Sequence, residues 1–232
     1  MTRGLFTDIA SVYDRMNALL SLGLDRRWRR TAVADAKGRP SHVLDLACGT
    51  GEFSIELARR FADAEVLGVD FAPAMLEIAR QKNDSPRVRF EEGDASNLSA
   101  LRDGSFELCS CAFGFRNFPD RRKALAEVRR VLAAGGELLV LEFFRPANAV
   151  LGLLVSAWIR MVAAIFARGK SAAYRHLSES IWRMDTADGF QDMAGGLGFG
   201  LSSRRSFFPC CTFFHFVSGA RPGNPTGALQ AR

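Results

Sequence analysis

The stretch 42-HVLDLACGTGEFSIELARR-60 decides the fold. Residues 42–46 form an almost continuous apolar run, which is typical of a strand buried on both faces of a parallel sheet. The glycines at 49 and 51 then turn the chain, and residues 52–60 repeat apolar side chains at helical spacing. A buried strand, a tight glycine turn and an amphipathic helix together make one unit of a sheet that is covered by helices.

The same unit recurs along the chain. Further strands are predicted at 65–71, 87–94, 105–115, 137–144 and 211–221, and further helices at 6–36, 72–82, 121–132 and 149–167. This alternation predicts an α/β fold with a doubly wound, mostly parallel sheet. In such sheets, ligands bind at the carboxyl ends of the strands, near the point where the strand order reverses.

Composition favours one intracellular domain. The chain has 232 residues, of which 48% are hydrophobic, and this is enough for one buried core. No apolar run of secretory type opens the sequence, and the five cysteines form no CxxC pair. No set of residues has the spacing of a metal site. We therefore expect a single cytoplasmic domain over residues 1–220, a flexible tail over 221–232, and no metal.

The net charge of +6 is distributed unevenly. Residues 1–39 carry +4 and residues 145–183 carry +5, whereas residues 40–144 carry −4. The basic segments are either solvated helix faces or a rim that faces an anionic lipid surface or ligand. Nucleic acid is not an expected partner, because no binding motif and no interleaving of aromatic with basic residues is present.

Acidic residues stand at the ends of three predicted strands. Asp45 precedes the glycine turn, and Asp70 follows Gly51 by 19 residues, close to the offset of about 20 of a ribose-binding carboxylate. Asp94 ends the third strand. A pyrophosphate would be repelled by Asp45, whereas a cationic ligand with an adenosine part would suit all three acids. S-adenosylmethionine has both properties. The alternative is that Asp70 or Asp94 only caps a helix.

Several stretches resemble the UbiE/MenG-type ubiquinone and menaquinone biosynthesis C-methyltransferases. They are VLDLACGTGEFSIELA, VLGVDFAPAML, GDASNLS and AFGFRNFPDRRKALAEVRRVLAAGGELLVLEFFRP, with FTDIASVYDRMNALLSLGLDRRWRR and AYRHLSESI as lid-like segments. The resemblance covers residues 6–181 and becomes weaker after them. Residues 182–218 therefore give the least information about the substrate.

The resemblance implies a Rossmann-like class I methyltransferase. It implies a seven-stranded sheet, an N-terminal helical lid over residues 1–39 and a lid insertion over 146–183. The implied reaction is methylation of a ring carbon of a prenylated quinol, demethylmenaquinol or a ubiquinol precursor, by S-adenosylmethionine. The implied cofactor-binding residues are Asp45, Gly49, Thr50, Gly51, Asp70, Phe71, Asp94 and Ala95, with Tyr13 and Asn17 closing over the cofactor.

Arg116 and Asn117 are the candidate catalytic residues, because they follow a buried strand directly where it opens into a loop. Methylation at carbon needs an electron-rich ring, so a phenolate must form and be stabilised. Arg116 remains protonated and is a poor base. We expect it to stabilise the phenolate while Asn117 orients the ring oxygen. The alternative for Arg116 is a salt bridge to Glu142, and Asp94, solvent and His176 all remain open as the base.

The segment 145–170 is apolar with basic ends, Arg168 and Lys170. Arg160 interrupts it, so it is not expected to span a membrane. It is either a core helix or a helix that lies on an anionic membrane surface near a lipophilic quinol. The second interpretation makes the protein a peripheral membrane protein. A homodimer also remains open.

Two other functions remain compatible with the sequence. One is methylation of another lipophilic acceptor, such as a phospholipid amine or a phenolic natural product. The other is a non-catalytic protein that binds S-adenosylmethionine within a biosynthetic complex.

Overall fold

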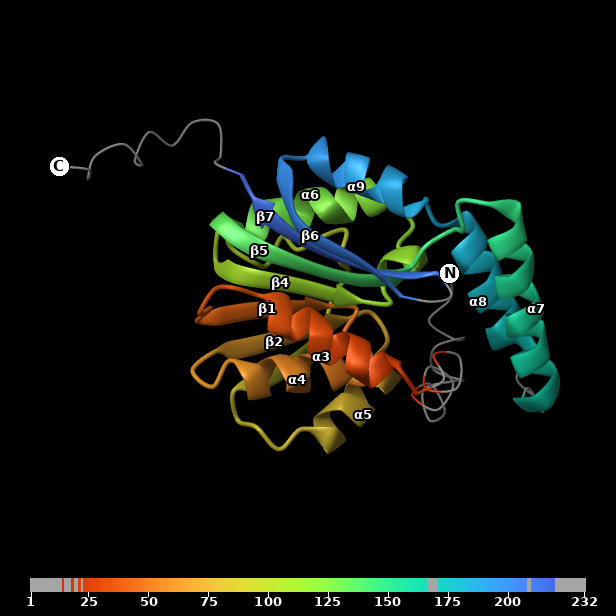
Figure 1. The fold of residues 1–232 in the computed structure, drawn as a ribbon. Coiled ribbons are helices and arrows are strands. Elements are labelled where there is room, and N and C mark those ends of the chain that lie inside the picture. Colours follow the sequence, from red (N-terminus) through yellow and green to blue (C-terminus); the bar gives the residue numbers. More distant parts are fainter. Residues whose placement is uncertain are drawn as a thin grey trace.

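The computed structural model describes residues 14, 18, 21, 23–166, 171–207 and 210–219. Its centre is one seven-stranded sheet in the order β3-β2-β1-β4-β5-β7-β6 (Figure 1). The pairs along β3-β2-β1-β4-β5 are parallel, and β7 is antiparallel to both β5 and β6. The strands are β1 (His42–Leu46), β2 (Glu65–Asp70), β3 (Val88–Glu92), β4 (Phe106–Ala112), β5 (Leu132–Phe143), β6 (Phe199–Phe207) and β7 (Cys211–Ser218).

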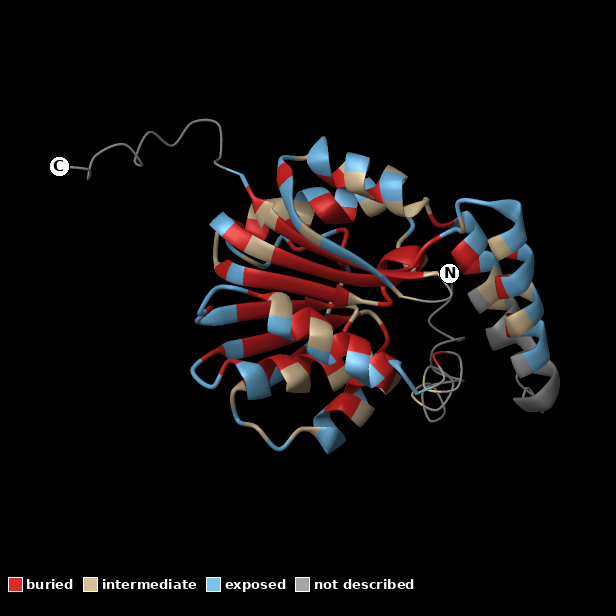
Figure 2. Cartoon of the chain, in the orientation of Figure 1, coloured by how far each residue is buried: buried red, intermediate tan, exposed pale blue. Residues whose placement is uncertain are grey.

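Helices cover both faces of the sheet. In the described part of the chain they are α3 (Asp25–Asp35), α4 (Glu52–Arg60), α5 (Pro73–Lys82), η2 (Phe115–Asn117), α6 (Arg121–Val131), α7 (Ala149–Phe166), α8 (Ser171–Arg183) and α9 (Ala187–Gly195). One apolar core joins α3, α4 and α5 to the sheet, and a second core joins α6 and α9 to the opposite face. Along β7, Phe213 points into the first core, while Phe214 and Phe216 point into the second. Figure 2 shows the strands as the buried layer between the helices.

The fold confirms the predicted doubly wound α/β sheet with mostly parallel strands. The predicted helix over 6–36 was too long within the described residues, because a turn at Gly23, with φ at +75°, precedes α3. The predicted helix over 121–132 ends one residue earlier. Residues 133–136 form an irregularity of β5 between its pairings with Phe106 and Leu108.

Sequence periodicity missed α9 and β6. The centre of β6 is Leu-Ser-Ser-Arg-Arg-Ser, and most of its residues are exposed. Among the described strands it pairs with β7 alone, at the edge of the sheet, so it needs no apolar run on either face.

A buried histidine ties α3 to the sheet. His215 on β7 is fully buried, with Nδ1 3.2 Å from Asp35 Oδ2 and Nε2 2.8 Å from Glu137 Oε2. Burial opposes ionisation of both carboxyls. At Asp35, the hydrogen bond from Ser203 and the interaction with His215 outweigh the effect of burial and lower the pKa. At Glu137, the interaction with His215, together with backbone hydrogen bonds, lowers the pKa in the same way. The last turn of α3 is thereby held to β5, β6 and β7.

We expect His215→Leu to destabilise the protein by about 3 kcal/mol at pH 7, because the largely buried carboxyls of Asp35 and Glu137 both lose the polar side chain that they contact. Carboxyls whose pKa is lowered by folding stabilise the protein above their unfolded pKa of about 4 and lose that effect below it. The free energy of unfolding that His215→Leu loses should therefore become smaller towards pH 3.5. Urea unfolding at both pH values measures it. His42→Leu, at an exposed histidine, is the matched control, and an equal loss at both pH values would contradict the expectation.

Candidate active site

The strand order reverses between β1 and β4, which are neighbours in the sheet. In the described part of the chain, two non-glycine residues have positive φ: Ala47 at 50° directly after β1, and Phe113 at 60° directly after β4. A Cβ added to Gly114 would lie 2.5 Å from the Cβ of Ala47, so the two strand ends are in close contact. Backbone strain of this kind concentrates at functional sites, and it marks this edge of the sheet.

Asp70 fixes the glycine turn that follows β1. Its Oδ2 accepts the Gly49 N–H at 2.9 Å, and its Oδ1 accepts the Ala72 N–H at 2.9 Å. Burial raises the pKa of Asp70, although these backbone hydrogen bonds oppose that rise. Gly51 has φ at +80°, and an added Cβ would lie 2.8 Å from the Phe90 ring. The turn therefore requires glycine at 51, both for its conformation and for space.

A cleft of about 330 Å³ opens beside this turn. Its lining comes from the ends of β1, β2 and β3 and from the loop that contains η2: Ala47, Val69, Asp70, Phe71, Gly93, Asp94, Ala95, Asn117, Phe118 and Pro119. Its walls are mainly apolar, and it has two carboxylates. Asp94 uses Oδ1 to accept the Ser96 N–H at 2.8 Å. Apolar walls suit a planar heterocycle, and a carboxylate suits a ribose diol, so the cleft fits a nucleoside.

A second, smaller cavity of about 20 Å³ adjoins the cleft, because Ala47 lines both. Asp45 lies in it, 1% exposed, and accepts hydrogen bonds from Ser54 and Ser110, each at 2.6 Å. Burial raises the pKa of Asp45 to about 6, against these two hydrogen bonds. A buried carboxylate of this kind is stabilised by positive charge, which Arg29 on the same cavity supplies in part. A ligand in the cleft that brings further positive charge beside Asp45 would therefore be favoured.

Asp14 is a residue of this cavity that sequence reasoning missed. It accepts the Thr50 hydroxyl at 2.6 Å and pairs with Lys82 at 2.5 Å. Lys82 also pairs with Glu52 at 2.9 Å. Asp14 lies within the N-terminal segment that was expected to form the lid, between the two residues singled out there. Its position between Tyr13 and Asn17 is the feature of the sequence that could have pointed to a role for Asp14 in the site.

Arg116 turns away from both cavities. Its Nη1 donates to Glu142 Oε1 at 2.8 Å and to the Phe113 carbonyl at 2.6 Å, and its backbone N–H donates to Glu142 Oε2. Both side chains are buried, 5% and 0% exposed. The salt bridge to Glu142 is the arrangement that the sequence analysis gave as the alternative for Arg116.

Asn117 behaves differently, because it lines the cleft. Its Oδ1 lies 3.1 Å from Nε2 of His176 on α8. Burial lowers the pKa of His176, and the positive charge of Arg116 lowers it further. The loop after β4 thus brings Asn117 to the wall of the cleft, and His176 of α8 contacts Asn117 from behind that wall.

The predicted site residues fall into five groups. Asp70, Phe71, Asp94, Ala95 and Asn117 line the cleft, and Asp45, Gly49 and Thr50 line the smaller cavity. Gly51 supports the turn, and Arg116 lies behind it in its salt bridge. Tyr13 and Asn17 lie outside the described residues, as do Arg168, Lys170 and the tail.

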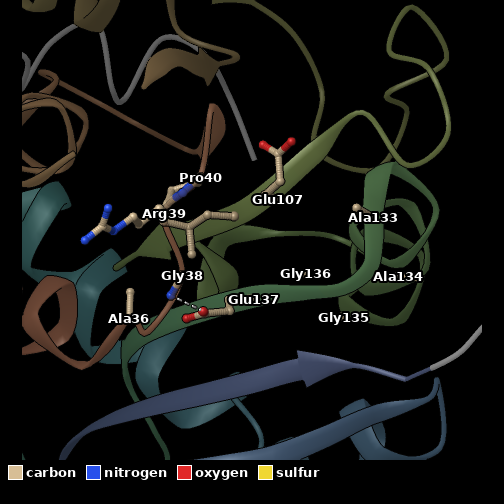
Figure 3. Close-up of a pocket in the computed structure, with 11 residues that line it drawn as sticks. Ala36, Gly38, Arg39, Pro40, Glu107, Ala133, Ala134, Gly135, Gly136 and Glu137 are labelled. Carbon is tan, nitrogen blue, oxygen red and sulfur yellow. Dashed lines mark hydrogen bonds between the residues drawn. The ribbon is translucent and has the colours of Figure 1, made fainter. Parts of the chain in front are cut away.

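A further cavity of about 240 Å³ lies at the opposite edge of the sheet (Figure 3). It is formed by the α3–β1 connection, the start of β4 and residues 133–137 of β5. The Glu137 carboxylate there accepts the N–H groups of Lys37 and Gly38 and pairs with His215. This cavity is at the amino ends of the parallel strands, where ligands of such sheets do not bind. Among the described residues, no group of His, Cys, Asp and Glu could hold a metal ion.

Comparison with known proteins identifies relatives over nearly the whole chain. A profile of the ubiE/COQ5 methyltransferase family matches residues 2–217. The demethylmenaquinone methyltransferase of Deinococcus radiodurans is 43% identical over 201 residues, 84% of this chain and 83% of that protein. The protein of the same name from Thermus thermophilus is 44% identical, covering 84% of this chain and 91% of its own length.

A solved SAM-dependent methyltransferase of Thermotoga maritima has the same fold. Its TM-score is 0.67 at 20% identity, and the match covers 94% of this chain and all of that one. At this identity the likeness concerns the fold alone.

We expect Asp45→Asn to be more stable than the wild type at pH 8, in the absence of ligand. Folding raises the pKa of Asp45 from 3.8 to about 6, so the wild type loses stability as the pH rises between these values. This loss of stability is about 3 kcal/mol, and the asparagine side chain of the variant avoids it because it does not ionise. Urea unfolding at pH 4 and pH 8 measures the difference.

The same substitution should weaken S-adenosylmethionine binding by at least about tenfold, because the buried negative charge is gone. Asp63→Asn, at an exposed turn, is the control for both measurements. A variant that is no more stable at pH 8 than at pH 4, relative to the wild type, would show that Asp45 is not held at a raised pKa.

Proposed function

The chain belongs to the ubiE/COQ5 methyltransferase family, and we propose from that membership and from its site that it methylates a ring carbon of demethylmenaquinol, with S-adenosylmethionine as the methyl donor. The observation that carries the proposal is the joined pair of cavities at the strand switch. It combines an apolar nucleoside cleft, a buried carboxylate beside it, and the amide of Asn117 on the cleft wall.

The residues at the switch fit the donor. Asp70 would hold the ribose hydroxyls, Asp94 and Ala95 the adenine edge, and Phe71 one face of the ring. The Gly49–Gly51 turn and Asp45 would hold the methionine end, whose ammonium and sulfonium charges match the buried carboxylate. When bound, this donor supplies a methyl group on a positively charged sulfur, an electrophile that needs no metal.

The acceptor side of the proposal rests on Asn117 and Arg116. Asn117 lies on the wall of the nucleoside cleft, where its amide can bind a ring oxygen. Arg116 is adjacent in sequence and is fixed by Glu142, so its orientation does not depend on the substrate. We assign it an indirect part in stabilising the phenolate, because it lines neither cavity. Its Nη1 donates to Glu142 and to the Phe113 carbonyl, so that contribution acts through the loop that holds Asn117 rather than through a direct contact or through net charge.

Transfer of labelled methyl from S-adenosylmethionine to a short-chain demethylmenaquinol and to a benzoquinol precursor of ubiquinol tests the function. Arg116→Ala alone would leave Glu142 buried without its cation and would unfold part of the protein. The double variant Arg116→Met, Glu142→Gln removes both charges. We expect it to remain folded, to keep its affinity for S-adenosylmethionine and to lose at least about a hundredfold in kcat.

Arg122→Ala, at an exposed arginine of α6, is the matched control and should transfer methyl at the wild-type rate. Full activity of the double variant would make Arg116 a structural residue. Tight binding of S-adenosylmethionine by the wild type without transfer to either quinol would contradict the proposed function and favour another lipophilic acceptor. Transfer only to the benzoquinol would change the substrate.

The outer face of α7 is the second part of the proposal. Val150, Leu153, Leu154 and Met161 are between 47% and 71% exposed, and they recur at helical spacing with Ala157 and Arg160 (Figure 2). No helix of the described residues is long and apolar enough to cross a bilayer. We assign this α7 stripe to an anionic membrane surface, because Arg145 and Arg160 are exposed beside it and a prenylated quinol resides in lipid.

Flotation with vesicles tests this assignment. The wild type should float with vesicles rich in phosphatidylglycerol and less with neutral ones. Leu153→Glu should weaken binding at least about tenfold, since one buried leucine is worth about 2 kcal/mol. Leu201→Glu, at the exposed leucine of β6, should bind like the wild type. Failure of the wild type to float would overturn the assignment, as would a dimer in sedimentation that Leu153→Glu dissociates.

A further inference from the structure

The smaller cavity beside the glycine turn has a cation on its wall as well as the Asp45 carboxylate. Arg29 of α3 lines this cavity together with Asp45, Gly49 and Thr50. The arginine is 8% exposed, and its positive charge opposes the rise that burial causes in the pKa of Asp45. The cavity volume of about 20 Å³ has room for one small polar group, which is the end of a chain rather than a ring. An anion and a cation therefore share a site that admits only such an end.

Asp25 and Phe113 hold the guanidinium of Arg29 in place. Nη1 donates to Asp25 Oδ2 at 2.5 Å, and Asp25 Oδ1 accepts the Ser21 hydroxyl at 3.1 Å. Cζ of Arg29 lies 5.3 Å from the centre of the Phe113 ring, so the guanidinium also rests on an aromatic face. Phe113 follows β4 with a positive φ and stacks on Phe143, with 5.1 Å between the ring centres. The backbone at the strand switch thus supports the arginine as well as the cavity.

These contacts leave part of the guanidinium without an acceptor. Nε of Arg29 is buried and has no hydrogen-bond partner among the described residues. The oxygens of Asp45 accept the hydroxyls of Ser54 and Ser110 instead. Nε shares one edge of the planar guanidinium with Nη2, and such an edge matches the two oxygens of a carboxylate. A buried charged donor that the fold itself does not satisfy indicates a site that a ligand completes.

We propose that Arg29 binds the α-carboxylate of the methyl donor through this edge. This inference rests on the proposed function, and it gives the smaller cavity a defined ligand chemistry. The carboxylate of an amino-acid end pairs with Arg29, and the ammonium of the same end lies on the Asp45 side. The site therefore selects a nucleoside that has a complete amino-acid end over one that has only an amine. The alternative is that Arg29 serves only as a counter-charge for Asp45.

Two ligands that differ by one carboxylate separate these roles. S-adenosylhomocysteine has both the carboxylate and the ammonium, whereas its decarboxylated analogue keeps only the ammonium. Calorimetry measures both ligands on the same protein, so any loss of folded protein cancels from the ratio of the two affinities. The wild type should bind S-adenosylhomocysteine at least about tenfold more tightly than the analogue, because the contact with a carboxylate is charge-assisted and bidentate.

The double variant Asp25→Asn, Arg29→Gln tests the arginine. It removes both members of the buried pair, so neither charge is left without its partner. We expect the preference for S-adenosylhomocysteine to fall by at least about tenfold, while the affinity for the decarboxylated analogue is kept or rises. Arg26→Gln, at an exposed arginine of the same helix, is the matched control and should keep the wild-type preference.

An unchanged preference in the double variant would overturn the inference. An equal change in the affinity for both ligands would overturn it too, and would make Arg29 a counter-charge of Asp45. A wild type that binds neither ligand would overturn the proposed donor and the carboxylate site together. A preference that depends on Arg29, in a wild type that methylates no quinol, would contradict the proposed function alone and would support the carboxylate site.

Discussion

The close contact between the ends of β1 and β4 is the constraint on which the site depends. The chain leaves these neighbouring strands in different directions, and each strand is followed by a residue with positive φ, Ala47 and Phe113. Gly114 allows the two ends to touch, because any side chain there would meet Ala47. This backbone directs the glycine turn to one side and the Arg116–Asn117 loop to the other. The two cavities and the position of the Arg116–Asn117 loop follow from that divergence.

The candidate site contains a buried carboxylate, Asp45, whose ionisation destabilises the folded protein. Asp45 is buried with a raised pKa, although two serine hydroxyls donate to it and the charge of Arg29 lies nearby. A carboxylate in such surroundings lowers the stability of the ligand-free protein, and a cationic ligand recovers that loss. Asp35 and Glu137 show the opposite case, because His215 between them lowers the pKa of both. One end of the sheet is thus specialised for stability, and the other end for binding.

The local part of the site could be predicted from the sequence, but the long-range pairings could at most be given as alternatives, as for Arg116 and Glu142. The Gly49–Gly51 turn and the acids at strand ends are readable, because strand and helix periodicity place them at one edge of the sheet. The partners of Arg116 and Asn117 come from β5 and α8, and only the folded chain shows that Glu142 takes the guanidinium. The polar edge strand β6 escaped notice because an edge needs no apolar pattern.

The two helices of the lid insertion link the two halves of the proposed mechanism. α8 contacts η2 through its His176 side, and its Trp182 packs against α7 so closely that a Cβ on Gly152 would lie 2.6 Å from the indole ring. α7 in turn carries the exposed apolar stripe. This packing connects the exposed apolar stripe of α7 to the loop that carries Asn117. A quinol could therefore place its head at Asn117 while its prenyl tail stays in the bilayer, so the proposed membrane contact and the proposed acceptor contact belong to one structural unit.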